Sequence, residues 1–180
     1  LFDEESVDVC RKFVKLKNRL MPYLYGKAVE AHEYGIPMMR PMILEFPDDP
    51  ACDTLDRQYM MGDALLVAPI FRKDGLVQYY LPEGLWTSLL DGEVVDGGKW
   101  QTEIHDFMSL PLWVRENTLL PVGRVNDQVD YDYADGLELH VFRPEDGTIT
   151  VNVPDLQGNI AATYTVTTVK IFWLISKILS

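Results

Sequence analysis

The sequence predicts an α+β protein, with helix and buried strand in its first third and antiparallel β structure after that. Residues 3–34 carry apolar side chains at helical spacing, whereas beyond residue 71 short apolar runs alternate with turn signals about every 8–12 residues. Of the 180 residues 47% are hydrophobic, which is ordinary for a folded chain. That length suits one domain, or one small domain with part of another.

The first expected element is a helix over residues 3–34 that is interrupted near its middle. Its apolar spacing is carried by Val7, Cys10, Phe13, Val14 and Met21, with Lys17 as a polar break. Pro22 should kink the helix or split it in two, because proline lacks an N–H donor and clashes with the preceding turn. Gly35, followed by Ile36 and Pro37, predicts the helix end.

Two apolar runs then predict buried parallel strands at residues 38–44 and 63–70. A loop at residues 45–50 and a short helix at 51–60 are expected between them. Two such strands cannot close a sheet, because a parallel strand needs neighbours on both sides. We therefore expect the chain to be a severed part of a larger protein.

The rest of the chain predicts an antiparallel β-sandwich. Strands are expected at residues 77–81, 85–90, 107–114, 118–122, 137–142 and 148–153. Asp91-Gly92 is a strong hairpin signal, and residues 163–169 alternate as a strand whose return partner is missing. The apolar tail at 170–180 lacks strand alternation. Its helical face would comprise Ile171, Leu174, Ile175 and Ile178.

Charge and cysteine content exclude several classes of function. The formal net charge of -12 repels phosphate backbones and anionic bilayers, so neither a nucleic acid nor a membrane is expected as a partner. The tail is also shorter than the about 20 residues that a spanning helix needs. Cys10 and Cys52 form no C-x-x-C pair, which favours reduced thiols and a cytoplasmic location.

Several stretches, in order along the chain, carry a resemblance to a known family. They are residues 19–25 (Arg-Leu-Met-Pro-Tyr-Leu-Tyr), 37–42 (Pro-Met-Met-Arg-Pro-Met), 45–50 (Glu-Phe-Pro-Asp-Asp-Pro), 58–60 with 62–69, 80–86 and 110–121. With their spacing kept, these stretches together resemble glycoside hydrolase family 31. The Phe-Pro-Asp-Asp-Pro segment is similar to the bacterial α-xylosidase branch of that family.

The resemblance implies a (β/α)₈ barrel followed by proximal and distal β-sandwich domains. Residues 1–62 would then be the C-terminal remnant of the catalytic barrel, with its helix and last strand. Residues 63–125 would form the proximal sandwich, and residues 126–180 would begin a distal β domain with an atypical tail. The implied activity is that of a retaining α-xylosidase or α-glucosidase, which hydrolyses O-glycosyl bonds of oligosaccharides in carbohydrate metabolism without a metal or other cofactor.

Retaining glycosidases use two carboxyl groups about 5–5.5 Å apart, one as nucleophile and one as acid and base. In the family resembled, both groups are Asp on earlier barrel strands, and the motifs that carry them are absent from this sequence. No catalytic residue is therefore transferred. We expect the chain by itself to be inactive and to serve as structural support for the enzyme.

Asp48, Asp49 and Phe46 are the candidate substrate-binding residues. They follow the expected last barrel strand, and the loops after such strands build the active sites of barrel enzymes. The interpretation is that this loop forms part of the rim of the sugar pocket. The alternative is a solvated, proline-bounded turn with helix-capping acids. Adjacent side chains in an extended loop diverge, so Asp48 and Asp49 make a poor acid–base pair.

Arg40 and the tryptophans raise separate questions. Arg40 interrupts an apolar run, and because a buried guanidinium needs partners, a structural ion pair is favoured over a role at the sugar site. Trp86 and Trp113 are expected in the sandwich core. Trp100 lies beside Gly97-Gly98-Lys99, and its sequence context leaves core packing and sugar stacking both open.

Other polar residues favour no chemistry. His32, His105 and His140 have no partner at metal-ligand spacing, and Ser88 and Ser109 lack the G-x-S-x-G context of a serine hydrolase. The acidic loop of Asp130, Asp132 and Asp135 fails as a calcium site, because Ala134 and Val141 stand at ligand positions.

A second class of function stays open beside the glycosidase interpretation: a stand-alone carbohydrate-binding or interaction module built from the β region. The orphan helix–strand segment would also expose apolar surface, and large exposed apolar patches promote association. We therefore expect a homo-oligomer, a swapped arrangement, or disorder in residues 1–60.

Overall fold

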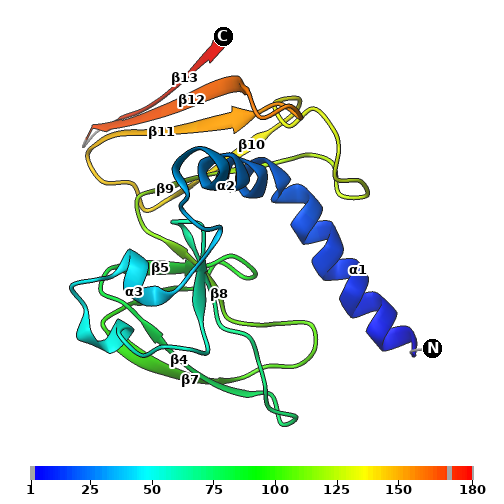
Figure 1. The fold of residues 1–180 in the computed structure, drawn as a ribbon, viewed down its shortest axis with the longest axis vertical. Helices are drawn as coiled ribbons and strands as arrows, with labels where there is room; N and C mark the ends of the chain where they lie inside the picture. Colours follow the sequence, from blue (N-terminus) through cyan, green and yellow to red (C-terminus); the bar gives the residue numbers. More distant parts are fainter. Residues whose placement is uncertain (1–2, 170–171, 180) are drawn as a thin grey trace. The chain divides into compact units, whose positions relative to one another are not determined.

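The computed structural model describes residues 3–169 and 172–179, and within these the chain is mostly β with few helices (Figure 1). Two compact units divide it. The first combines residues 1–36 with 117–180, and the second is the continuous segment 37–116. Every pairing between described strands is antiparallel. The sequence-based expectation of antiparallel β structure is therefore confirmed, and it extends to the regions expected to be parallel.

The described helices and strands have the following bounds. The helices are α1 (Glu4–Arg19), α2 (Met21–Tyr34), α3 (Met42–Glu45) and the 3₁₀ turn η1 (Pro50–Cys52). The strands are β1 (Met39–Arg40), β2 (Tyr59–Met61), β3 (Leu65–Val67), β4 (Leu76–Leu81), β5 (Leu85–Ser88), β6 (Val94–Asp96), β7 (Lys99–Ile104), β8 (Leu112–Arg115), β9 (Thr118–Val122), β10 (Glu138–Phe142), β11 (Gly147–Pro154), β12 (Ile160–Val169) and β13 (Phe172–Leu179).

The expected interrupted helix is present as α1 and α2. Asp3 caps α1 by accepting hydrogen bonds from the backbone N–H and the hydroxyl of Ser6, and these bonds lower the pKa of its carboxyl. The break falls at Leu20, and Pro22 sits in the first turn of α2, where its missing N–H costs nothing. Gly35 ends α2 at φ 71°, a left-handed conformation that glycine adopts without strain.

Both helices belong with the C-terminal strands rather than with the segment that follows them. The N–H of Gly123 donates to the carbonyl of Arg19 at 2.7 Å, and the Arg19 guanidinium donates back to the Gly123 carbonyl at 3.0 Å. The hydroxyl of Tyr131 donates to the carbonyl of Asn18 at 2.8 Å. Figure 1 shows α2 lying against β9 and β11. Residues more than 100 positions apart therefore form one core.

The sheet β11-β12-β13 covers that core with one face. Val153, Ala162 and Val166 are fully buried, whereas threonine pairs on the opposite face join hydroxyls at 3.1 and 3.3 Å. The prediction that the strand near residues 163–169 lacks a return partner is wrong, because β12 pairs with β11 and with β13. The expected helix in the tail is also wrong for residues 172–179, whose backbone forms β13. Ile171 lies outside the described residues.

The second unit contains a sheet in the order β1-β2-β3-β8-β5-β6 and a separate ladder of β4 with β7. The parallel strand expected at residues 38–44 is wrong. Only Met39 and Arg40 are extended, and they pair antiparallel with β2. Pro41 follows at φ -61°, and the chain turns into α3, where Met42 is fully buried. Of this helical turn only Met42 packs into the core, whereas Ile43 and Leu44 are 44% and 49% exposed. A short apolar run does not distinguish such a turn from a strand.

Three further expectations need adjustment in this unit. The strand expected at residues 63–70 exists but shortens to β3, which pairs antiparallel with β2 and β8. The short helix expected at 51–60 reduces to the turn η1, and residues 59–61 form β2 instead. The strand expected at 107–114 begins only at Leu112, whereas β7 was missed because its sequence is polar and half-exposed.

The core of the second unit is closed by buried hydrogen bonds as well as by apolar packing. Trp86 and Trp113 are 1% and 3% exposed, which confirms the prediction for both. The indole N–H of Trp113 donates to the hydroxyl of Tyr79, which in turn donates to Glu103 at 2.7 Å. Burial and the hydrogen bond to Glu103 raise the pKa of Tyr79 above its usual range. These bonds fix the β4–β7 ladder against the larger sheet.

Candidate functional site

The strongest candidate site is a pocket of about 550 Å³ in the second unit, within the size range of small-molecule sites. Its wall is the loop after α3, together with the end of β4, the turn after β4 and the end of β8. The lining residues are Glu45, Phe46, Pro47, Asp48, Asp49, Pro50, Tyr80, Pro82, Glu83 and Arg115. The structure thus brings the sequence-predicted Phe46, Asp48 and Asp49 into the lining of one pocket.

Asp49 is held in place from two sides. One carboxylate oxygen accepts from the N–H of Ala51 at 3.0 Å and caps the turn η1, and the other accepts from the hydroxyl of Tyr80 at 3.0 Å. Burial, reinforced by the hydrogen bond to Asp49, raises the pKa of Tyr80 to about 12. The capping role that the sequence offered as an alternative is therefore present, and it orients Asp49 at the pocket wall.

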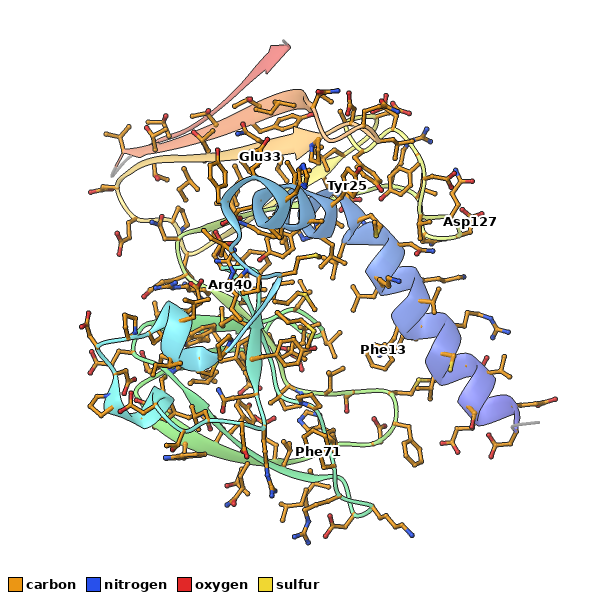
Figure 2. All side chains as sticks on the ribbon, in the orientation of Figure 1. Phe13, Tyr25, Glu33, Arg40, Phe71 and Asp127 are labelled. Carbon is orange, nitrogen blue, oxygen red and sulfur yellow. The ribbon has the colours of Figure 1, made fainter. Side chains whose placement is uncertain are left out.

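The pocket lining also holds a guanidinium over an aromatic ring. The guanidinium of Arg115 lies 4.9 Å from the ring centroid of Phe46, a cation–π distance. It also lies 3.7 Å from Glu45, whose other carboxylate oxygen is 2.6 Å from Arg40. Arg40, labelled in Figure 2, is only 4% exposed, so the structural ion pair predicted for it is confirmed.

The turn at Pro82 and Glu83 depends on glycine. Gly84 adopts φ 118°, and the N–H of Gly97 donates to its carbonyl at 2.8 Å. A side chain on Gly97 would overlap the carbonyl of Pro82, which already accepts from the indole N–H of Trp86 at 2.8 Å. Close backbone approach of this kind admits only glycine. The glycine at position 97 thus allows the close backbone packing that positions the turn carrying Glu83.

Trp100, which the sequence left open, is exposed. Its side chain is 59% accessible, in contrast to the buried Trp86 and Trp113. It is the cross-strand partner of Tyr80 in the β4–β7 ladder, and the two ring centroids are 5.7 Å apart. A flat apolar surface therefore adjoins the pocket through Tyr80.

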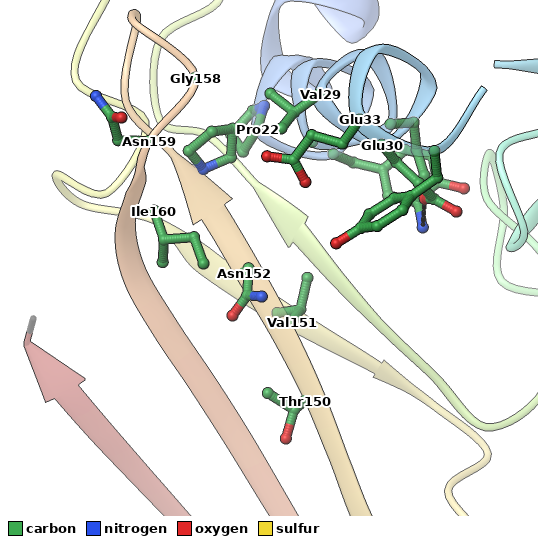
Figure 3. A pocket seen from close by; sticks show the side chains of 15 residues that line it. Pro22, Val29, Glu30, Glu33, Thr150, Val151, Asn152, Gly158, Asn159 and Ile160 are labelled. Carbon is green, nitrogen blue, oxygen red and sulfur yellow. Dashed lines mark hydrogen bonds and ion pairs between the residues drawn. The ribbon is translucent and has the colours of Figure 1, made fainter. Parts of the chain in front are cut away.

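A second pocket, of about 620 Å³, lies in the first unit between α2 and the strands β11 and β12 (Figure 3). Glu30 and Glu33 project from α2, and Thr150 and Asn152 come from β11. Lys27 forms an ion pair with Glu30 at 3.0 Å and lies over the ring of Tyr23. Lys27 and Glu30 are thus paired within one helix, and Glu33 adds a further carboxyl group to the lining.

No group of three metal-ligating side chains was found among the described residues. His105 accepts or donates between Ser109 at 3.0 Å and Glu103 at 2.7 Å, and His140 pairs with Glu138 at 2.9 Å. Each of these two histidines is thus hydrogen-bonded to side chains close to it in the sequence. In the described part of the chain, no helix has the length and apolarity required to cross a bilayer.

Comparison with known proteins assigns most of the chain. Residues 35–120 match the glycosyl hydrolase family 31 C-terminal domain, and residues 132–170 match the C-terminal domain of alpha-xylosidase YicI. The chain belongs to glycoside hydrolase family 31. The two matches follow each other in order and place the candidate pocket within the family 31 C-terminal domain.

The family 31 relatives include enzymes from bacteria and fungi. The chain is 41% identical over 165 residues to alpha-xylosidase XylQ of Lactiplantibacillus pentosus, covering 89% of this chain and 22% of that protein. It is 39% identical to an alpha-xylosidase of Emericella nidulans, covering 86% of this chain and 21% of that protein. The chain therefore spans about a fifth of the length of these curated relatives.

Solved family 31 structures share the fold. A dextranase of Flavobacterium johnsoniae matches with a TM-score of 0.81 at 26% identity, covering 93% of this chain and 22% of that one. An alpha-xylosidase of Xanthomonas citri matches with a TM-score of 0.74 at 27% identity, covering 90% and 19%. These matches support the mostly β, antiparallel architecture as that of the family 31 C-terminal region.

Sequence reasoning missed the other half of the family 31 candidate pocket. Tyr80, Glu83 and Arg115 lie on separate strands and turns, and no local motif connects them to the loop at residues 45–50. The signal that was available is indirect. The stretches quoted for the family resemblance include Tyr80, Glu83 and Arg115, so all three were marked as distinctive without a role.

Proposed function

We propose that this chain is the C-terminal region of a retaining α-glycosidase that removes α-linked xylose or glucose from oligosaccharides. The observation that carries the proposal is the ordered pair of family matches at residues 35–120 and 132–170, together with relatives named as alpha-xylosidases. In this proposal the reacting carboxyl pair lies upstream of the sequence given. The chain supplies packing for the barrel's end and a β cap that braces it.

The finer organisation is part of the same proposal. The sequence-based division had residues 1–62 as the end of the catalytic barrel. Because the match to the family 31 C-terminal domain begins at residue 35, we propose that the barrel's end is confined to the residues before it, with the proximal sandwich extending to residue 125 and the distal domain starting at residue 126. The contacts of α1 and α2 with residues 117–169 suit a brace, because they tie the proposed barrel helices to the distal strands. A cytoplasmic location and self-association of the chain complete the proposal.

Turnover by the purified chain tests the proposal. With an aryl α-xyloside as substrate, we expect no hydrolysis above the rate in buffer, because no acid and nucleophile pair is assigned to these residues. A heat-labile activity that copurifies with the chain and is absent from the matched double variant Asp48→Asn with Asp49→Asn would contradict it. Light scattering on the same preparation tests self-association, which a monodisperse monomer would exclude.

A second candidate function is a carbohydrate-binding module. It is favoured by one observation, the exposed Trp100 ring beside a polar pocket. Binding by the β region alone requires no catalytic group, so this candidate is compatible with an inactive chain.

A further inference from the structure

Trp100 has an environment that core packing does not explain. More than half of its surface is accessible, and its ring lies beside that of Tyr80, tilted by 55° at a centroid distance of 5.7 Å. The hydroxyl of Tyr80 in turn donates to Asp49 at the pocket wall. Exposing an indole costs free energy, since burial of apolar surface is the main source of stability. Thr102, the next outward-facing residue of β7, is polar and bonds to Gln78 at 3.2 Å. Trp100 shares this exposed face of β7 with Thr102 and Ile104, and it is the residue of the three that is paired with the pocket-lining Tyr80.

The pocket offers hydrogen-bond acceptors and donors together. Asp48 and Glu83 contribute carboxylate acceptors, and the Arg115 guanidinium contributes N–H donors at a side chain that is 42% exposed. A hydroxyl group both donates and accepts, so a polyhydroxylated molecule satisfies both kinds of side chain. Its apolar ring face would meet an aromatic plane, and Trp100 provides that plane.

We propose that this pocket, with Trp100 and Tyr80 as its aromatic border, is a binding site for a neutral oligosaccharide. One sugar unit lies against Trp100, and the hydroxyls of a neighbouring unit reach Asp48, Glu83 and Arg115. The site is separate from any reacting carboxyl pair and holds its ligand without cleaving it. The proposal is independent of the glycosidase assignment, because binding here requires no upstream residue.

The charges of the pocket distinguish a neutral sugar from other ligands. An anionic ligand would face Glu45, Asp48, Asp49 and Glu83. A cation would be attracted by those carboxylates but opposed by the guanidinium of Arg115, held over Phe46 at the same wall, and the spermidine titration below tests this alternative. A net charge of -12 on the chain further disfavours anions. A neutral molecule with many hydroxyls avoids both conflicts.

The site is also largely preformed, which reduces the entropy that binding costs. Asp49 is fixed by Ala51 and Tyr80, and Arg115 is held by Phe46 and Glu45. Since one aromatic face and a few polar contacts carry the affinity, we expect a dissociation constant on the order of 1 mM.

Fluorine NMR on the full chain labelled with 5-fluorotryptophan tests the proposal. The resonance of Trp100 is assigned by its loss in Trp100→Phe. We expect a saturable shift of that resonance on titration with at least one of maltotriose, cellotriose or xylotriose, while the resonances of the buried Trp86 and Trp113 stay in place. No shift of Trp100 with any of the three sugars overturns the proposal.

Variants separate the parts of the site, with affinity measured by calorimetry. Trp100→Ala should weaken binding about tenfold or more through the lost ring contact, and Asp48→Asn by about threefold through a weaker acceptor. Ile104→Ala is the matched control, because Ile104 is an exposed apolar residue of the same strand outside the pocket. It should bind as the parent chain does.

Circular dichroism and thermal unfolding of each variant establish that the fold is kept. Unchanged sugar affinity in a folded Trp100→Ala chain would refute the site. An equal shift of the Trp100 resonance with spermidine would refute the ligand class. Neither result depends on hydrolysis, so failure here and failure of the proposed glycosidase function are distinguished by separate measurements.

Discussion

Both units of this chain bury an apolar core, but they differ in how their segments are connected. Residues 37–116 fold as one continuous segment around Trp86 and Trp113. The other unit joins α1 and α2 to strands that begin after residue 117, and its core gathers around Tyr131, Tyr133 and Tyr164. Closing contacts between remote segments costs more chain entropy than closing local ones. The comparison teaches that sequence patterns predict local elements in both units, but they do not reveal which remote segments combine into the discontinuous one.

The largest expected effect is the loss of a buried ring in the continuous unit. Trp86→Ala removes a side chain that is 1% exposed and bonded to the Pro82 carbonyl at 2.8 Å, so we expect destabilisation of about 3–5 kcal/mol. Trp100→Ala is the matched control at 59% exposure and should change stability by less than about 0.5 kcal/mol. Urea unfolding measures both. Equal losses for the two variants would mean that burial does not separate these tryptophans.

Hydrogen exchange on the same variant tests whether the two units unfold separately. In Trp86→Ala, amides of β3, β5 and β8 should lose protection, because their sheet packs on this ring. Amides of β11 and β12 should keep theirs, since they belong to the other core. Parallel loss in both sets would show that the units unfold together.

The next largest effect concerns the buried ion pair of the continuous unit. Arg40→Met removes the guanidinium that lies 2.6 Å from Glu45, and both side chains are largely buried at 5% and 13% exposure. Leaving Glu45 with only Arg115 at 3.7 Å should cost about 3 kcal/mol. The double variant Arg40→Met with Glu45→Leu should recover most of that loss, because the buried carboxylate is removed and Arg115, which also loses Glu45, is 42% exposed. Chemical denaturation of the parent chain, the single variant and the double variant measures these free energies of unfolding. No recovery of stability in the double variant would contradict the pairing.

A smaller effect is expected in the discontinuous unit at Gly123, where the C-terminal strands contact α1. A side chain on Gly123 would overlap the hydroxyl of Tyr131, so Gly123→Ala should destabilise by about 1–3 kcal/mol through overpacking. Gly26→Ala is the control in the same unit. Gly26 lies within α2, and an added methyl group meets only ordinary contacts at 3.7 Å, so that variant should be stabilised by about 0.4–1 kcal/mol. Thermal unfolding with the same sign for both variants would refute this distinction.

The smallest expected effect is a loss of stability in alkali, which both units share. Burial raises the pKa of Tyr80 in one unit, and of Tyr131 in the other, to about 12. A raised phenol pKa contributes stability that is complete below the unfolded pKa of about 10 and is lost as pH rises toward 12. Tyr80→Phe should flatten the pH dependence between about pH 10 and 12 in the continuous unit only. Hydrogen exchange and unfolding against pH measure it, and an unchanged slope in Tyr80→Phe would count against the assignment.

Several elements could be predicted from local sequence because their cause is local. Pro22 splits the first helix, Gly35 ends it, and Asp91-Gly92 turns a hairpin between β5 and β6. Phe46, Asp48 and Asp49 were also placed correctly in one loop, since proline and acids mark it. The remaining pocket residues could not be predicted, because the register that sets Tyr80 beside Trp100 is a property of paired strands.

Errors at residues 38–44 and in the tail have one physical source. Apolar composition alone does not distinguish a strand of either direction from one helical turn. At residues 38–44 it does not indicate burial either, because Met39, Ile43 and Leu44 are exposed. At residues 38–44, Pro41 and the ion pair between Arg40 and Glu45 turn the chain into α3. In the tail, residues 172–179 form a strand because they pair with the edge of β12.

The sequence by itself indicated the family through the resemblance of several stretches. It also determined the split and the end of the first helix, the turn at Asp91-Gly92 and the burial of Trp86 and Trp113, because these signals are local. Tertiary structure alone decided which helices join which strands, that every described pairing is antiparallel, and that Trp100 stands exposed beside Tyr80. These properties depend on hydrogen bonds and contacts between segments far apart in the chain. Such contacts are set by the free energy of the whole fold, and no short stretch of residues carries them.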